Sequence, residues 1–299
     1  MNLNIIRAMV LLMLFWAVKS QGQQVNYNVL SNDPEKHNNF SIGASLFPNI
    51  DAWTGVDLLT AFGVNVEGTY RFGPGSIRYT HEFRGGDDAF THQTITGTFA
   101  LMNRVINNVT RVDLDYSFNT NSYSTTYIEV PSQSLETFEI RGGLDRMNPI
   151  LEYGEKDEDG DIIFEHDLPV QITSFHGGIQ YTLTDNIHIT TDGYGKKKNK
   201  QQILWYADVL YAFRMNIADP DMATFEAVRS DNLSEINYSR IGFRTGIKWW
   251  SLTNIGWGVG VEYGWRPTVR PAENSTWSRF HLGIRLTAPI VSFRLPYLG

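Results

Sequence analysis

A few histidines, one of them close to a serine, are the side chains in this chain best suited to catalysis. Ser174 and His176 are two residues apart, and His188 and His281 follow later. A hydrolase needs a nucleophilic hydroxyl and a histidine base within hydrogen-bonding distance. Alternate residues of one strand are about 7 Å apart between Cα atoms, and the sequence contains no Gly-x-Ser-x-Gly elbow. The pattern leaves a hydrolase as an alternative function, and a structural role for these histidines explains it more simply.

An acidic segment could gather a metal ion. Residues 155–161 carry carboxylates at alternate positions, and calcium prefers oxygen ligands of this kind. Gly160 does not stand where an EF-hand loop requires its glycine, so a solvated turn is the simpler interpretation. The chain has no cysteine, which excludes disulfides, thiolate zinc sites and a cysteine nucleophile. We therefore predict no catalytic residue, no metal and no cofactor.

Many charged residues alternate with apolar ones. Between residues 240 and 248, Arg240, Arg244 and Lys248 stand opposite aliphatic and aromatic side chains. Such a polar face could line a narrow passage whose basic wall favours anionic solutes, or its opposite charges could pair and fill the interior, because unpaired buried charges are costly. The polar side chains predicted to share this enclosed face are Arg111, Asp113, Asp115, Arg240, Arg244, Lys248, Glu262, Arg279, His281 and Arg285.

The elements that must position these side chains are β-strands. From residue 63 to residue 72, Val64, Val66 and Tyr70 fall on one face while Glu67 and Arg71 fall on the other. A period of two is typical of a strand that separates two unlike environments. The same alternation recurs over residues 111–118, 174–183, 203–215, 240–249, 255–265 and 279–286.

Turn signals divide the strands into hairpins. Very short connections are predicted at residues 73–75, 184–186 and 251–254, where Gly, Pro, Asn, Asp and Ser gather. Longer polar loops are predicted at residues 84–92, 143–167, 193–201 and 266–275. The count is 14 strands if residues 224–229 form a strand. It falls to 12 if residues 222–228 form a helix that begins at Asp219 and Pro220.

The N-terminus has the pattern of a cleaved secretory signal. Arg7 precedes an apolar run from residue 8 to residue 18, Lys19 ends that run, and small residues lie at positions 20 and 22. The run is about half of the roughly 20 residues that a transmembrane helix needs. We predict a signal peptide over residues 1–22, a flexible periplasmic lead-in over 23–38, and one barrel domain over 39–299.

Composition narrows the class further. The 299 residues are 42% hydrophobic and 13% aromatic, and only 19% are charged. A net charge of −7 argues against a nucleic-acid partner, whose phosphates need a basic surface. The apolar faces carry Trp and Tyr near strand ends, which suits membrane interfaces better than the core of a soluble sandwich.

These features resemble the Gram-negative outer-membrane β-barrel proteins. The resemblance covers the chain from about Phe40 to Phe293 and rests on the signal peptide, the repeated amphipathic strands, the aromatic strand ends and the lack of cysteine. It is architectural and identifies no subfamily. Many members end in a strand whose last residue is aromatic, whereas this chain ends in Tyr297, Leu298 and Gly299.

The fold predicted from these patterns is all-β: a transmembrane antiparallel up-and-down barrel of about 12–14 strands, with short periplasmic turns and longer extracellular loops. The resemblance implies location in the outer membrane, contact with its lipid, insertion by the barrel-assembly machinery, and contact with other envelope proteins. The predicted function is non-catalytic, either a small polar-solute channel or a barrel component of a surface or export assembly. The alternatives are an embedded hydrolase and a soluble secreted all-β binding protein.

Overall fold

The computed structural model describes residues 25–35, 39–51, 62–84, 90–119, 122–156, 162–217, 236–251, 255–271 and 280–295. Every regular secondary-structure element in these ranges is a β-strand. Within the same ranges no helix has the length and apolar character needed to cross a membrane. The predicted signal peptide, Arg279 and the segment 222–229 lie outside the described residues.

Fourteen strands are present in the described residues. Their bounds are β1 Tyr27–Asn32, β2 Phe40–Asp51, β3 Phe62–Phe72, β4 Gly75–Arg84, β5 Phe90–Asn119, β6 Ser122–Asn148, β7 Ile150–Lys156, β8 Ile162–Thr191, β9 Gly195–Ile217, β10 Ile236–Ser239, β11 Ile241–Ser251, β12 Ile255–Trp265, β13 Thr268–Pro271 and β14 Phe280–Phe293.

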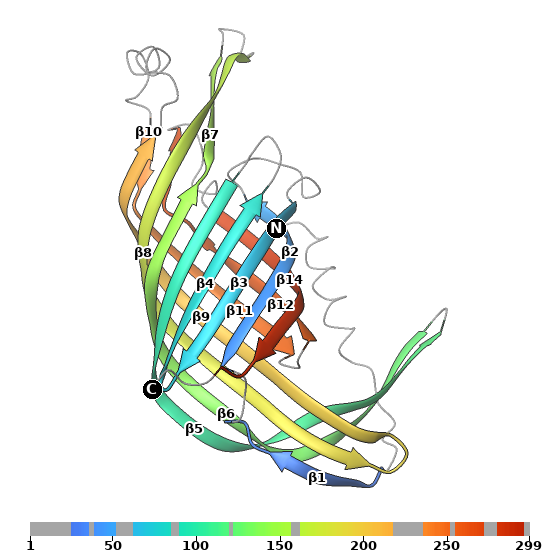
Figure 1. Ribbon diagram of the computed structural model, residues 1–299. Helices are drawn as coiled ribbons and strands as arrows, with labels where there is room; N and C mark the ends of the chain where they lie inside the picture. Colours follow the sequence, from blue (N-terminus) through green and yellow to red (C-terminus); the bar gives the residue numbers. More distant parts are fainter. Residues whose placement is uncertain are drawn as a thin grey trace, which may run out of the picture.

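Ten of these strands close into an antiparallel barrel (Figure 1). The order around the ring is β8, β6, β5, β4, β3, β2, β14, β12, β11 and β9, and β9 pairs back with β8. The ring is also closed between β2 and β14, where Phe40 pairs with Phe293. The all-β barrel predicted from the alternating pattern is thus confirmed.

The predicted number of 12–14 barrel strands is wrong, because four of the ring strands are far longer than the roughly ten residues typical of outer-membrane strands. β5, β6, β8 and β9 contain 30, 27, 30 and 23 residues. Residues 184–186, predicted as a turn, lie inside β8, and most of the loop predicted at 193–201 belongs to β9. Alternation is a local pattern and does not distinguish one long strand from two strands in line.

The alternating faces separate charge from apolar surface in the ring. Asp208 and Arg244 point inward and are 2% and 5% exposed, whereas Val209 and Leu286 point outward and are 61% and 56% exposed. This arrangement is the reverse of a soluble barrel in water, where apolar side chains gather inside.

Aromatic side chains on the outer face gather near both ends of the ring. The rings of Trp249, near the end of β11, and Trp257, near the start of β12, are 4.8 Å apart between centroids, and so are those of Phe40 and Phe293, at the start of β2 and the end of β14. These strand ends lie at the lower end of the ring in Figure 1. At the other end Trp265 packs on Phe243 and Phe280, with centroid separations of 4.6 and 5.6 Å.

Short turns lie at the lower end. The predicted turn at residues 73–75 joins β3 to β4, and Gly73 has a φ of 50°, a left-handed conformation that glycine adopts without a Cβ clash. β11 and β12 pair as antiparallel neighbours, and residues 252–254 of the turn predicted at 251–254 lie outside the described residues. Of the long loop predicted at 143–167, residues up to Asn148 instead continue β6, and β7 pairs with the start of β8.

The long strands run past the lower end of the ring and form a second packing unit, which we call the lower sandwich (Figure 1). β8 leaves β6 after the pair Asp185–Ser134, and β1 takes the place of β6 beside β8. Residues 27–32, expected to belong to a flexible lead-in, therefore form a paired strand. The lower sandwich consists of β1, residues 101–119 of β5, 122–133 of β6, 186–191 of β8 and 195–200 of β9.

The core of the lower sandwich is built from the outward face of the barrel strands. Its buried members are Val112, Leu114, Ile128, Val130, Ile187 and Ile189. Ile187 has the same strand parity as the outward-facing Phe175 and Ile179 of β8. The apolar face that is exposed around the ring is thus covered in the lower sandwich, where residues 101–119 of β5 and 122–133 of β6 pack on the ends of β8 and β9. As a result, the face that lines the interior of the ring becomes the exposed face of the sandwich.

We predict that Asp185→Ala weakens the junction between ring and sandwich. Asp185 is 5% exposed, and Ser134 Oγ and Gln201 Nε2 donate hydrogen bonds to its two carboxylate oxygens. Its loss leaves buried donors unsatisfied and should cost about 1–3 kcal/mol. The measurements are the free energy of unfolding in urea and the rate at which protease cuts residues 101–133. Asp192→Ala, in the exposed turn between β8 and β9, should leave both unchanged, and equal effects of the two changes would contradict the prediction.

Candidate functional site

The structure brings together half of the residues predicted to share an enclosed polar face. Arg244 and Lys248 on β11, Glu262 on β12, and His281 and Arg285 on β14 are all at most 9% exposed and point into the ring. They lie on three neighbouring strands, β11, β12 and β14, so they form one wall of the interior.

Four of the other predicted residues do not line the interior. The fifth, Arg279, lies outside the described residues. Arg111, Asp113 and Asp115 belong to the lower sandwich, where the side chains of Arg111 and Asp113 are 52% and 35% exposed. After the register shift between Ala100 and Met102, Arg111 and Asp113 continue the lumen face of β5, but the ring does not extend to their level. Asp115 follows a second shift and pairs with Thr126 on the opposite face. Arg240 is exposed and donates to the carbonyl oxygens of Ala212 and Phe213.

Asp145 on β6 is the centre of the interior and is fully buried. Arg244 Nη1 donates to its Oδ1 at 2.7 Å, and Thr94 Oγ1 donates to the same oxygen at 2.8 Å. His92 Nε2 lies 3.1 Å from Oδ1, and His176 Nδ1 is hydrogen bonded to Oδ2. One carboxylate thus holds side chains from β5, β8 and β11 together.

A second carboxylate continues the network across β9. Asp208 lies 2.9 Å from Arg141 Nε and 2.8 Å from Arg244 Nε. The Arg141 guanidinium stands 4.1 Å from the ring centroid of Tyr206, a cation–π contact, and the Tyr206 hydroxyl donates to Glu262. These contacts bridge β6, β9, β11 and β12.

Two further ion pairs cross the interior. Lys248 Nζ lies 2.7 Å from Glu67 Oε2, although β12, β14 and β2 separate their strands along the ring. Arg285 Nη2 lies 3.2 Å from Glu82 Oε2 on β4 and 3.6 Å from Glu262 Oε1. Side chains from nearly opposite walls therefore meet in the middle of the barrel.

The charges of the network nearly cancel. Its described members include six carboxylates and five cations, each of these cations forms an ion pair, and Arg71 lies near Glu139. The cations are Arg78, Arg141, Arg244, Lys248 and Arg285, and the carboxylates are Glu67, Glu82, Glu139, Asp145, Asp208 and Glu262. Opposite charges paired at close range are the arrangement that makes burial of ions tolerable.

The list of site residues predicted from the sequence omitted the central acids. Asp145 fell in a segment expected to be a loop, but Phe138, Ile140 and Leu144 alternate with Glu139, Arg141 and Asp145 and could have indicated a strand. Asp208 stands on the inward face of residues 203–215, where the other inward residues are mostly apolar or aromatic.

His176 is two residues from Ser174, but its hydrogen-bonded hydroxyl is that of Thr96. His176 Nε2 lies 3.1 Å from Thr96 Oγ1, and its Nδ1 is bonded to Asp145, so the connectivity is hydroxyl, histidine, carboxylate. Ser174 Oγ is buried and has no hydrogen-bond partner among the described residues. Thr96 is only 2% exposed, and Asp145 is shared with Arg244 and His92, which favours a structural role for this relay.

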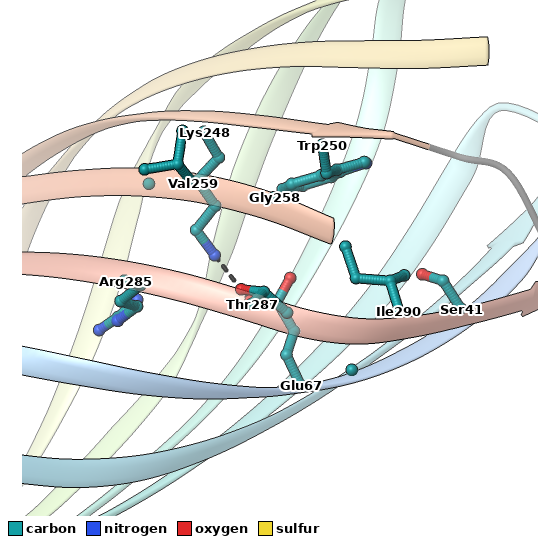
Figure 2. Close-up of a pocket in the computed structure, with 11 residues that line it drawn as sticks. Ser41, Glu67, Lys248, Trp250, Gly258, Val259, Arg285, Thr287 and Ile290 are labelled. Atoms are coloured by element: carbon teal, nitrogen blue, oxygen red, sulfur yellow. Dashed lines mark hydrogen bonds and ion pairs between the residues drawn. The ribbon is translucent and has the colours of Figure 1, made fainter. Parts of the chain in front are cut away.

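A hollow opens near the lower end of the ring (Figure 2). It occupies about 490 Å³ counted to its open mouth. Lys248 and Glu67 meet at one side of it, and Trp250 and Ile290 lie at another. Gly258 allows the close approach of β12 to Trp250, because a Cβ there would be 2.7 Å from Trp250 Cβ.

Metal binding finds no support in the described residues, where no group of three His, Asp or Glu side chains is arranged to hold an ion. Residues 157–161 of the acidic segment lie outside the described residues.

Lysines 196, 198 and 200 follow one face of β9 in the lower sandwich, and Lys198 pairs with His188. Burial lowers the pKa of Lys200, and the charge of Lys198 lowers it further. Burial and the same two lysines lower the pKa of His188, so its neutral form is favoured.

No protein-family model, no characterised protein and no solved structure matches this chain.

Proposed function

We propose that this chain is an integral barrel of the outer membrane of a Gram-negative bacterium, without catalytic activity and without an open channel. In this proposal the barrel anchors the lower sandwich at one membrane surface as a component of a larger envelope assembly. The observation that carries the proposal is the inverted barrel, whose charged side chains are buried inside while its apolar ones are exposed outside. Such a surface is unfavourable in water and favourable in hydrocarbon.

The aromatic clusters support a membrane position. From Trp257 to Trp265 on β12 the strand covers about 26 Å at 3.3 Å per residue, and a tilt of about 40° reduces this to about 20 Å in height. That height approaches the apolar band of about 25 Å in known outer-membrane barrels, which aromatic girdles border on both sides. Heat-modifiable migration in detergent gels and a requirement for detergent in solution would support this position, whereas a folded, detergent-free monomer would contradict it.

The interior favours a closed barrel over a solute channel. Ion pairs such as Lys248–Glu67 and Arg285–Glu82 join distant walls, and both carboxylate oxygens of Asp145 accept hydrogen bonds from Arg244. A solute moving along the barrel axis would have to break these buried contacts, each of which is costly to open.

The proposed orientation places the lower sandwich in the periplasm. The short turns, β1 and the end of β14 lie at the same end of the ring as the sandwich. In outer-membrane barrels the short turns are periplasmic. The sandwich would then be the part of the chain available to periplasmic partners. During insertion, the partners of the barrel would be the assembly machinery and the membrane lipid.

We predict that the purified protein gives no steady conductance in planar lipid bilayers. Replacing Glu67 and Lys248 together by alanine removes one cross-lumen contact without changing the net charge, and should raise the conductance at least tenfold above the baseline of the unmodified protein. Replacing Arg111 and Asp113 together by alanine is the matched control, since this pair lies in the sandwich. Steady conductance of the unmodified protein would contradict a closed barrel.

A hydrolase is the second candidate, and the Thr96–His176–Asp145 connectivity is the observation that favours it. The test is hydrolysis of a small activated ester by the detergent-solubilised protein. Turnover that disappears in both His176→Ala and Thr96→Val would establish this candidate and overturn the non-catalytic proposal.

A further inference from the structure

The hollow in Figure 2 exists because its walls are made of small residues. Ser41 and Gly43 on β2, Gly258 and Gly260 on β12, and Thr287 on β14 line it. Elsewhere the interior is filled by long charged side chains that pair with one another. The space left here is therefore the part of the barrel best able to accept a small molecule.

Two cations, Lys248 and Arg285, and one carboxylate, Glu67, line the hollow, and Arg78 contacts Glu67. Glu67 lies 2.7 Å from Lys248 Nζ and 3.3 Å from Arg78 Nε, so two cations share one carboxylate. The side chains of Lys248 and Arg78 are only 10% and 8% exposed, and both lie near the ring of Trp250, at 6.0 and 5.6 Å from its centroid. An anionic group placed beside Lys248 would give the two cations that share Glu67 a second anionic partner.

The other side of the hollow is apolar because β14 changes register there. The pairing of β14 with β2 shifts between Thr287 and Ile290, and its pairing with β12 shifts between Gly256 and Gly258. Pro289, which has no N–H for the ladder, lies within the first shift. The shift turns Ile290 to the lumen face, where it is 6% exposed, so an aliphatic side chain faces Trp250 across the hollow.

We infer that this hollow binds an amphiphile with one anionic head and a short alkyl chain, with the head beside Lys248 and Arg78 and the chain between Trp250 and Ile290. A fatty-acid carboxylate and an anionic membrane lipid share this chemistry. The inference goes beyond the proposed function, and it does not require the barrel to be closed to solutes.

The experiment titrates octanoate into the full-length protein in a non-ionic detergent and follows the heat of binding. Lys248→Gln, which removes one cation of the shared pair, should weaken binding at least tenfold. Thr287→Leu, which fills the hollow without changing charge, should weaken it at least as much. Lys198→Gln makes the same change of charge in the lower sandwich and should leave the affinity unchanged within twofold.

Two further ligands separate head from chain and lipid from free acid. Octanamide, with the same chain and no charge, should bind at least tenfold more weakly than octanoate. Dihexanoylphosphatidylglycerol tests the lipid: if it alone binds, and binds through Lys248, the natural ligand is a membrane lipid, and if octanoate alone binds, it is a free carboxylate. The inference would be overturned if neither octanoate nor dihexanoylphosphatidylglycerol binds, or if octanamide binds as tightly as octanoate. It would also be overturned if both Lys248→Gln and Thr287→Leu leave the affinity for octanoate unchanged. If Lys248→Gln does not fold, the Thr287→Leu result decides.

Discussion

Replacing Asp145 by alanine is expected to destabilise the barrel by about 3–5 kcal/mol, because it removes one partner of a buried ion pair. Arg244 would keep only Asp208, and His92, His176 and Thr94 would lose their common acceptor. Buried groups left unpaired cost more than the pair itself contributes. The measurements are the free energy of unfolding in urea and the fraction of folded, heat-modifiable protein.

Asp113→Ala is the control for this prediction. Asp113 is also paired with an arginine on β5, Arg111, but both side chains are partly exposed in the lower sandwich. Exposed pairs contribute between about zero and 1 kcal/mol. Losses of similar size for Asp145→Ala and Asp113→Ala would mean that the interior of the barrel is wet and that the network does not close it.

An arginine at Ile284 tests the membrane position of the ring, with an expected loss of about 2–4 kcal/mol near the middle of the bilayer. Ile284 is 39% exposed on the outer face and pairs with Val261, which lies midway between Trp257 and Trp265. In the proposed position the guanidinium would have to enter hydrocarbon. The measurement is the free energy of unfolding, and the yield of folding, in lipid vesicles.

Val29→Arg provides the contrast. Val29 is a 48% exposed aliphatic residue of β1, which lies outside the ring, and a charge there should change the stability by no more than about 0.5 kcal/mol. A soluble barrel predicts small effects at both positions. Near-equal tolerance of Ile284→Arg and Val29→Arg would therefore reject the proposed membrane band.

The alternation of polar and apolar residues was determined by the sequence alone. Val209 and Asp208 are neighbours in the chain, and in any extended conformation their side chains point to opposite faces. The strands, their amphipathic faces, the turn at Gly73 and the inward set of Arg244, Lys248 and Arg285 follow from this local geometry, because each depends only on residues adjacent in the chain.

The tertiary structure alone decided how many strands the ring has and what covers each face. Asp113 and Asp145 both occupy the lumen face of their strands, yet only Asp145 lies inside the ring, because β4 stops pairing with β5 at Phe99. The meeting of Lys248 with Glu67 and the inward turn of Ile290 likewise depend on ring closure and on register. A period of two specifies two faces of a strand, but the side chains that meet across a barrel come from distant parts of the chain and are brought together only by strand pairing.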